Sequence, residues 1–431
     1  MLNRRHFLAA AAGFSASAVL VRPDSTAAAG LDGITTASMR GSIDATEMGV
    51  YPGALDDQSK AFARMLQAAS DRNLPLFLPP GIYVLSNLAL PSRVRLSGVP
   101  GASRLVYGGD GHMLVSEDGE HIELTGIVVD GANRWLSDNT QGVVDLRRVR
   151  HAVIDNCQIV GSGKNGIALE RVAGRIENTE ISGAADAGIY SVEASGLQIS
   201  GNSVSDCANG GTGQNGNGIN VFRANNVMVS NNMVSDSAFS AIRANSASNI
   251  QISANSCIRS GETGIYAEFS FEGAIINANV VDGAANGISI VNFNEGGRMA
   301  VCSANIVRNL SPQGPYQQDP PGFGVGISVE ADCSAIGNVV ENVPLYGIQI
   351  GWGEYMRNVV ATGNVIRKAG TGIIISMVEG TGSAVVSDNV IDDVKDGAIV
   401  GYRWAEPATG DLAVDGAGGH ANLTIERNRV S

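Results

Sequence analysis

Basic side chains are in the minority in this chain of 431 residues, which contains 29 Lys and Arg against 42 Asp and Glu. The formal net charge at pH 7 is −13. Because phosphate recognition needs a basic surface, this balance excludes a general nucleic-acid binder. We therefore expect no nucleic-acid partner.

Cysteine and histidine are also scarce, with five residues of each type. The cysteines (Cys157, Cys207, Cys257, Cys302 and Cys333) lack the C-x-x-C spacing of metal sites and are too few for a dense disulfide framework. We expect most of them to be small buried apolar residues. The histidines (His6, His112, His121, His151 and His420) are scattered, so neither a metal site nor a Ser–His–Asp triad is expected.

No apolar run in the N-terminal region is long enough for a stable transmembrane helix. The uncharged run over residues 7–21 follows the segment NRRHFL, whose paired arginines resemble a twin-arginine export signal. The later stretch STAAAG suits cleavage near Ala29. A short N-terminal helix is the alternative interpretation. We predict a signal peptide over residues 1–29 and a soluble periplasmic or secreted protein that is exported already folded.

A repeat dominates the rest of the chain. Each unit has two apolar anchors five residues apart, and eleven of the twelve units hold an asparagine between them, while Gly126 replaces it in the first unit. The anchors are Ile122/Ile127, Ile154/Ile159, Ile176/Ile181, Ile199/Val204, Val229/Val234, Ile252/Cys257, Ile276/Val281, Cys302/Val307, Ala335/Val340, Ala361/Ile366, Val386/Ile391 and Ile425/Val430. The asparagines are Asn156, Asn178, Asn202, Asn232, Asn255, Asn279, Asn305, Asn338, Asn364, Asn389 and Asn428.

A second phrase follows most units and alternates apolar with polar residues, as in GINVF, GIYAE and GISVE. This period of two predicts half-buried strands, and the Gly and Asn residues between them predict tight bends. Three short strands and three bends in roughly 25 residues predict one coil of a parallel β-solenoid. Helical repeats are excluded because the apolar spacing is two or five, rarely three or four. Stacked at one bend, the asparagines can hydrogen-bond to one another, so we expect them to be scaffold rather than catalytic.

The asparagine ladder and the three-strand coil resemble the right-handed parallel β-helix of the pectate lyase and polygalacturonase superfamily. Residues 49–98 are similar to the N-terminal segment of that superfamily. There, Phe62, Met65, Leu66 and Ala69 lie on one face of a predicted helix, Asp57–Ser70, which would cover the first coil. With its export signal, the whole chain most closely resembles the twin-arginine-translocated repeat proteins of uncharacterised function. The expected organisation is an N-terminal segment with the capping helix (30–80), then a β-helix of about twelve to thirteen coils (81–431).

Three insertions interrupt the repeat at the same bend. The spacing from the second anchor to the next strand is seven or eight residues in most coils, but it is seventeen after Ile127, fifteen after Val204 and twenty after Val307. Loops that project from one edge of a rigid repeat commonly carry function. The resemblance implies that this bend and the strand after it form a polysaccharide cleft. The alternative is that a surface bend merely tolerates insertions.

The outward positions of the strands after this bend predict a polar and aromatic stripe. Period-two alternation places Tyr190, Asn220, Arg243 and Tyr266 in one column, with Asn245 and Glu268 beside it. Neighbours within a column should lie about 4.8 Å apart. The insertions add Trp135 and Tyr316, which suit sugar stacking or packing against their own loops.

This stripe suggests several kinds of chemistry. Arg243 could bind a uronate carboxylate, and Glu268 or Asp236 could act as an acid or base. Glu268 and Glu330, two coils apart, should have Cβ atoms about 9–10 Å apart, near the separation in inverting glycosidases. A solvent-exposed ion pair between Arg243 and Glu268 is the alternative. We expect no cofactor, although Asp206 with Asp236 could offer oxygen ligands to calcium.

The sequence departs from the catalytic families it resembles. It lacks the polygalacturonase Asn-Thr-Asp, Asp-Asp and Gly-His-Gly motifs, the pectate lyase calcium motif and the Asp-Pro-His-Asp of alginate epimerases. No catalytic residue can therefore be transferred from them. Three hypotheses stand: a lyase, hydrolase or epimerase acting on an acidic polysaccharide, a non-catalytic glycan-binding or envelope solenoid, and a structural protein that associates through its C-terminal coil.

Overall fold

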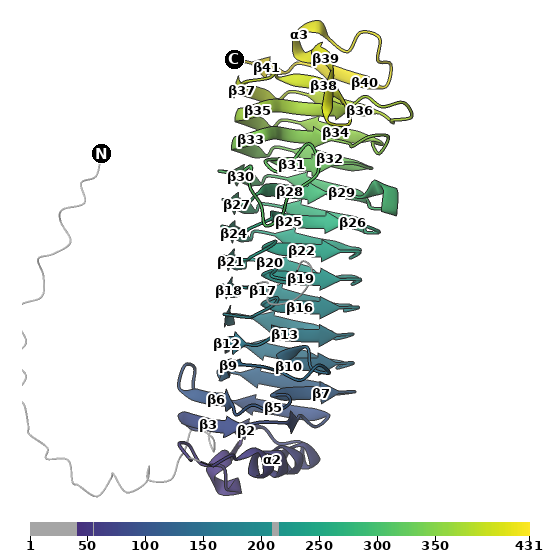
Figure 1. Ribbon diagram of the computed structural model, residues 1–431. Coiled ribbons are helices and arrows are strands. Elements are labelled where there is room, and N and C mark those ends of the chain that lie inside the picture. Colours follow the sequence, from purple (N-terminus) through teal and green to yellow (C-terminus); the bar gives the residue numbers. More distant parts are fainter. Residues whose placement is uncertain (1–40, 55, 209–214) are drawn as a thin grey trace, which may run out of the picture.

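Each repeat unit forms three short strands, and successive units stack these strands in parallel register. The result is a right-handed parallel β-helix of about 13 turns (Figure 1), which confirms the predicted fold class. The computed structural model describes residues 41–431, except Leu55 and residues 209–214. The predicted signal peptide, residues 1–29, lies outside the described residues.

The coils build three faces around one apolar core. The first face precedes the asparagine bend, and its strands are β1 (Ile43–Asp44), β2 (Leu76–Phe77), β5 (Arg93–Ser97), β8 (His121–Thr125), β11 (Ala152–Asp155), β14 (Gly174–Glu177), β17 (Leu197–Ser200), β20 (Met228–Ser230), β23 (Ile250–Ser253), β26 (Glu272–Asn277), β29 (Arg298–Ser303), β32 (Cys333–Ile336), β34 (Val359–Thr362), β36 (Ala384–Ser387) and β40 (Leu423–Glu426). All of its neighbouring strands pair in parallel.

The second face follows the asparagine bend. Its strands are β3 (Gly81–Leu85), β6 (Ser103–Tyr107), β9 (Val128–Arg134), β12 (Gln158–Ser162), β15 (Glu180–Ser182), β18 (Ser203–Ser205), β21 (Met233–Ser235), β24 (Ser256–Ile258), β27 (Val280–Asp282), β30 (Ile306–Arg308), β37 (Val390–Val394) and β41 (Arg429–Val430). Two longer strands, β33 (Val339–Ile350) and β35 (Val365–Ser376), run from this face into the third.

The third face completes each coil and carries the predicted stripe. Its other strands are β4 (Leu88–Ala89), β7 (Leu114–Glu117), β10 (Gly142–Arg147), β13 (Asn165–Glu170), β16 (Ile189–Val192), β19 (Ile219–Phe222), β22 (Ile242–Asn245), β25 (Thr263–Glu268), β28 (Asn286–Ile290), β31 (Ile327–Val329) and β38 (Ile399–Arg403). At the C-terminal end, β39 (Glu406–Asp411) pairs with β38 in antiparallel fashion.

Helices are short and few in the described part of the chain. Helix α2 (Ser59–Arg72) buries Phe62, Met65, Leu66 and Ala69 against the first coils, and Figure 1 shows it beneath the stack. It starts and ends two residues later than predicted. The remaining helical turns are η1 (Ala45–Met48), η2 (Phe293–Glu295) and α3 (Leu412–Asp415). None of the helices in this part is long and apolar enough to cross a membrane.

The asparagine ladder runs through nine consecutive coils. Each side-chain Nδ2 donates to the Oδ1 of the next asparagine at 2.9–3.0 Å, from Asn202 to Asn428. Asn156 and Asn178, which we expected in the ladder, lie one residue earlier, in the left-handed backbone region. Cys157 and Thr179 occupy the ladder position in those coils, and Thr179 accepts there through its hydroxyl. The prediction is wrong for these two asparagines because the bend is fixed by backbone conformation, not by residue type.

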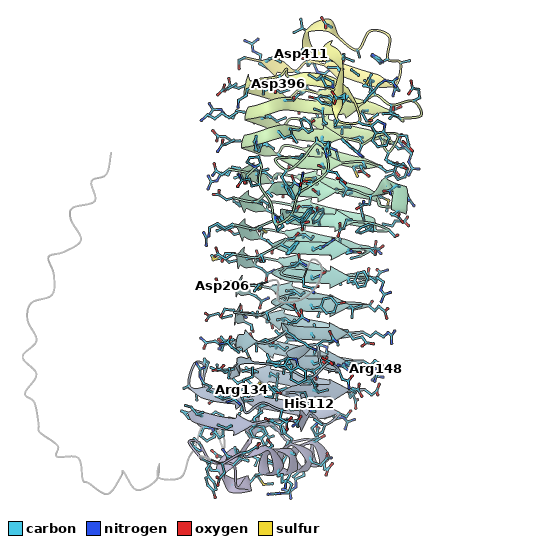
Figure 2. All side chains as sticks on the ribbon, viewed as in Figure 1. His112, Arg134, Arg148, Asp206, Asp396 and Asp411 are labelled. Carbon is cyan, nitrogen blue, oxygen red and sulfur yellow. The ribbon has the colours of Figure 1, made fainter. Side chains whose placement is uncertain are left out.

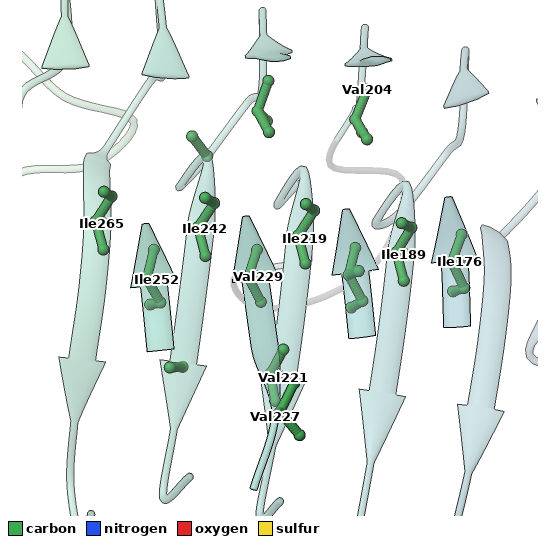
Figure 3. Packing of buried hydrophobic residues seen from close by; sticks show 14 of the residues in the cluster. Ile176, Ile189, Val204, Ile219, Val221, Val227, Val229, Ile242, Ile252 and Ile265 are labelled. Atoms are coloured by element: carbon green, nitrogen blue, oxygen red, sulfur yellow. The ribbon is translucent and has the colours of Figure 1, made fainter. Parts of the chain in front are cut away.

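Columns of Ile and Val side chains fill the interior (Figure 3). Ile189, Ile219, Ile242 and Ile265 are in direct register from strand to strand, and all are buried. A glycine precedes three of these isoleucines, at Gly188, Gly218 and Gly264, and close packing leaves little room for a side chain there, whereas Ala241 precedes Ile242. A Cβ on Gly218 would come within 2.2 Å of the Val234 side chain. The five cysteines are free and buried among these columns, as expected.

Candidate functional site

The predicted stripe exists on the third face. Strand pairing places Tyr190, Asn220, Arg243 and Tyr266 in consecutive register positions. Asn245 and Glu268 pair in the neighbouring column. Side chains from four separate coils therefore meet as the period-two pattern predicted.

Arg243 and Glu268 form an ion pair in the middle of this stripe. The Arg243 Nε lies 2.5 Å from Glu268 Oε1, and Asn245 Nδ2 donates to the same oxygen at 3.3 Å. The guanidinium lies 5.5 Å from the centre of the Tyr266 ring. Only 12% of the Arg243 side chain and 6% of the Glu268 side chain are exposed, so the expectation that they face solvent is wrong. Burial raises the pKa of Glu268, and Arg243 opposes that rise.

The segment between β30 and β31, residues 309–326, covers part of the same face. It folds back over the starts of earlier strands, and the Tyr316 hydroxyl donates to Glu262 Oε1 at 2.7 Å. The Tyr316 ring packs 6.4 Å from Phe239 and 5.4 Å from Phe323. The second oxygen of Glu262 accepts from the Ser240 hydroxyl at 2.8 Å. Tyr316 therefore fastens its own loop to two coils that precede it.

A cavity of about 400 Å³ lies between this covering segment and the third face. Its lining includes both predicted and unpredicted side chains: Tyr266, Tyr316, Ser328, Glu330, Gln349 and Trp352. The Gln318 Oε1 is buried there and has no hydrogen-bond partner among the described residues. The cavity thus combines aromatic rings with hydroxyl, amide and carboxyl groups.

Glu330 is a buried carboxyl in the lining of this cavity. The residue is 7% exposed, and its Oε2 accepts the backbone N–H of Phe293 at 2.6 Å. Burial raises its pKa to about 7, against the smaller opposing influence of the Phe293 and Asn292 amides. A carboxyl in this state is about half protonated at neutral pH, so it can donate a proton.

A second cavity, of about 410 Å³, continues the stripe toward the N-terminal coils. It is lined by Tyr190, Asn215, Asn220, Phe222, Arg243 and Asn245. The Asn220 Oδ1 is buried without a partner in the part of the chain that the structure describes. Because Arg243 lines this cavity and its strand neighbour Tyr266 lines the other, the two cavities lie next to each other on the third face.

Two predicted site residues lie elsewhere. Asp236 follows β21 on the bend at the edge of the stack and pairs with Arg259, with Oδ2 and Nη2 2.5 Å apart. The hydrogen bond from Arg259 holds the Asp236 pKa below its usual range. Trp135 is 64% exposed and precedes β10, four strand pairings from β22, or roughly 19 Å. The structure does not bring either residue to Arg243.

Asp206 and Asp236 are the two carboxylates that the sequence suggested as oxygen ligands for calcium, although no cofactor was expected. Both line one shallow surface cavity, and Figure 2 shows Asp206 at the margin of the stack. Across residues 41–208 and 215–431, Leu55 aside, no group of three or more His, Cys, Asp or Glu side chains is placed to hold a metal ion. The described residues therefore offer no set of ligands for calcium at this position.

Trp352 and Glu262 are site residues that the sequence pattern did not reveal. Trp352 lies two residues beyond the end of β33 and packs edge-on against Trp404, with the ring centres 5.7 Å apart. Glu262 precedes β25 and is buried. Both lie in bends, where the period of two no longer applies. The one signal in the sequence was the presence of an aromatic or acidic residue next to a Gly-Ile strand.

Comparison with known proteins supports the fold. A family model described as right handed beta helix region matches residues 141–297. The N-terminal fragment of bacteriophage phi29 gene product 12 is similar over 83% of this chain and 68% of its own, at 16% identity and a TM-score of 0.59. PfbA, a surface adhesin of Streptococcus pneumoniae, gives 13% identity and a TM-score of 0.51 over 84% of this chain and 94% of its own. The Dettilon tailspike protein gives 12% identity and a TM-score of 0.54 over 82% and 67%. No curated protein matches the sequence significantly.

Proposed function

We propose that the protein binds a polysaccharide on its third face, with the pocket beneath residues 309–326 holding the saccharide that is recognised or cleaved. One observation carries this proposal: a single cavity combines the rings of Trp352 and Tyr266, the amide of Gln349 and the buried carboxyl of Glu330. Aromatic rings suit the apolar faces of sugars, and amide and hydroxyl groups suit their polar edges.

The chemical role that we propose for Glu330 is general acid. A carboxyl with a pKa of about 7 carries its proton in about half of the molecules at pH 7, and it can transfer that proton to a glycosidic oxygen as the bond to carbon breaks. Asp319, on the covering segment, is the second carboxyl-bearing residue in the lining of the same cavity. In a hydrolytic reaction it would take a proton from the attacking water, so that water is added across the broken bond.

The electrostatics of the third face bear on the class of saccharide. The sequence predicted an acidic polysaccharide bound by Arg243. In the structure Arg243 is paired with Glu268, and Glu262 and Glu330 add further carboxyl groups nearby. We therefore propose a neutral sugar for the pocket, and an acidic polysaccharide is the competing prediction.

Replacing Glu330 tests this function. Glu330→Gln keeps a hydrogen-bond donor but cannot transfer a proton. Cleavage of the polysaccharide should therefore be lost, while binding persists. Binding by the wild type should weaken by about tenfold between pH 6 and pH 8, as the carboxyl loses its donor proton. Binding by Glu330→Gln should not depend on pH in this range. The measurements are reducing-end release and calorimetric titration over neutral and uronate-containing oligosaccharides.

The control is Glu170→Gln, on the same face but outside the pocket. It should leave binding, pH dependence and product release unchanged. Pocket binding without any product from any polysaccharide would favour the second candidate, a non-catalytic glycan-binding solenoid, which the missing catalytic motifs also support. Binding that persists after Trp352→Ala would contradict the pocket assignment itself.

The remaining predictions concern the setting of the protein. On the resemblance of residues 3–29 to an export signal, we propose twin-arginine export to the periplasm or beyond. We also propose association through the C-terminal coil.

Calcium is not expected to stabilise the protein. Since Arg259 already binds Asp236, calcium removal by EDTA should leave the melting temperature unchanged, as differential scanning calorimetry would show.

A further inference from the structure

The first face carries a groove of about 1010 Å³ that shares no lining residue with the third-face cavities. Its lining residues come from, or directly precede, seven successive strands, from β17 to β34. Six strand spacings of about 4.8 Å give the groove a length of roughly 29 Å along the axis. A groove of this length suits an extended chain-like ligand.

The floor of the groove combines amide and apolar side chains. Strand pairing aligns Gln198, Met228, Gln251, Ile275 and Val301 in one outward column. The apolar members are unusually open for their type, with Met228 37%, Ile275 44% and Val301 42% exposed. Asparagine amides stand along one rim, at Asn226, Asn249 and Asn358. The surface therefore offers both hydrogen-bonding and apolar contacts, and neighbouring side chains of the column lie one strand spacing apart.

The groove is almost free of charge. Asp332 is its one charged lining residue, and it is bound by Arg357 through both side-chain oxygens, with the Arg357 Nε to Asp332 Oδ1 distance at 3.1 Å. Arg298 lies 3.8 Å from the same carboxylate. An anionic or cationic ligand would find no unpaired opposite charge in this lining, so the complementary ligand is neutral.

The geometry disfavours two other occupants. A peptide that adds a strand needs an open sheet edge, but the strands from β20 to β32 are each paired on both sides. A second copy of this chain would bring two concave faces together and leave the hollow between them unfilled. A repetitive neutral polymer needs no open sheet edge, and as a single strand it can fill the groove.

We infer that this groove is a second ligand site, which binds a neutral polysaccharide strand lying along the axis of the β-helix. Amides of Gln198 and Gln251 contact sugar hydroxyls, and the side chains of Met228, Ile275 and Val301 contact the apolar faces of the rings. This inference does not depend on the proposed function of the third face, because the two sites share no residue.

The test uses the full chain and calorimetric titration with cellohexaose, laminarihexaose, maltohexaose and chitohexaose, with hexagalacturonate as the acidic comparison. At least one neutral hexasaccharide should bind, and Met228→Glu and Val301→Glu should each weaken it by tenfold or more. Val385→Glu is the matched control, since Val385 continues the same outward column beyond the groove. It should leave the affinity unchanged.

Several results would overturn the inference. The first is that none of the neutral hexasaccharides binds, and the second is that hexagalacturonate binds better than they do. The third is that Val385→Glu weakens binding as much as the two groove variants do. The fourth is that Trp352→Ala is the only substitution that weakens binding. Sedimentation of the wild type and Val301→Glu adds a further check, because a dimer that the substitution dissociates would assign the face to self-association. Unchanged circular dichroism and melting temperature in both glutamate variants would show that the folded protein was tested.

Discussion

Arg243→Met should destabilise the protein by about 3–5 kcal/mol at pH 7, because it leaves the Glu268 carboxylate buried without its partner. The pair is 88–94% removed from solvent by side-chain exposure, and no other cation is within 4.0 Å of Glu268 among the described residues. Chemical denaturation monitored by circular dichroism measures the change in the free energy of unfolding.

The pH dependence identifies the cause of this loss. The Glu268 pKa is already raised in the folded protein, and removing Arg243 raises it further. A carboxyl whose folded pKa is raised stabilises the fold below its unfolded pKa, and that contribution is lost as pH rises through the folded value. The deficit of Arg243→Met should therefore be small near pH 4 and largest at pH 7–8.

A double variant provides the control for this prediction. Arg243→Met with Glu268→Gln removes both charges and should recover most of the lost stability, because no buried carboxylate is left unpaired. A deficit that is the same at pH 4 and pH 8, or that the second substitution leaves in place, would show that Arg243 acts through packing rather than charge.

Asn255→Ala should cost roughly 2–4 kcal/mol through the loss of ladder hydrogen bonds. The Asn255 side chain donates to the Val229 carbonyl and to Asn279 Oδ1, both at 3.0 Å. Its Oδ1 accepts from the backbone N–H and the side chain of Asn232, also at 3.0 Å. Each buried group left without a partner costs about 1–3 kcal/mol, and partial relaxation of the bend limits the sum. Urea denaturation would measure the effect.

The matched control for the ladder is Gln251→Ala, in the same coil but with its side chain on the outer surface. It should change stability by no more than about 0.5 kcal/mol. Saccharide affinity per folded molecule should be unaltered by Asn255→Ala, since the ladder touches neither candidate site. An unchanged free energy of unfolding in Asn255→Ala would mean that the ladder does not stabilise the coil.

The repeat in the sequence is sufficient to determine the fold class. Anchors five residues apart and strands of period two specify three strands per coil, and stacking is then the one way to bury their apolar sides. The same period placed Tyr190, Asn220, Arg243 and Tyr266 in one column, because every coil adds one strand in direct register. The outward face of a regular strand can be predicted locally.

The tertiary structure decided what depends on contacts that do not repeat. Only the folded chain shows that Tyr316 donates a hydrogen bond to Glu262 and that Arg243 forms an ion pair with Glu268. The same holds for the hydrogen bond from the Phe293 amide to the buried Glu330. The left-handed residue in each bend likewise shifted the ladder from Asn178 to Thr179. Sequence period fixes the backbone of a solenoid, whereas burial and charge at its sites arise from irregular segments whose partners lie one or more coils away.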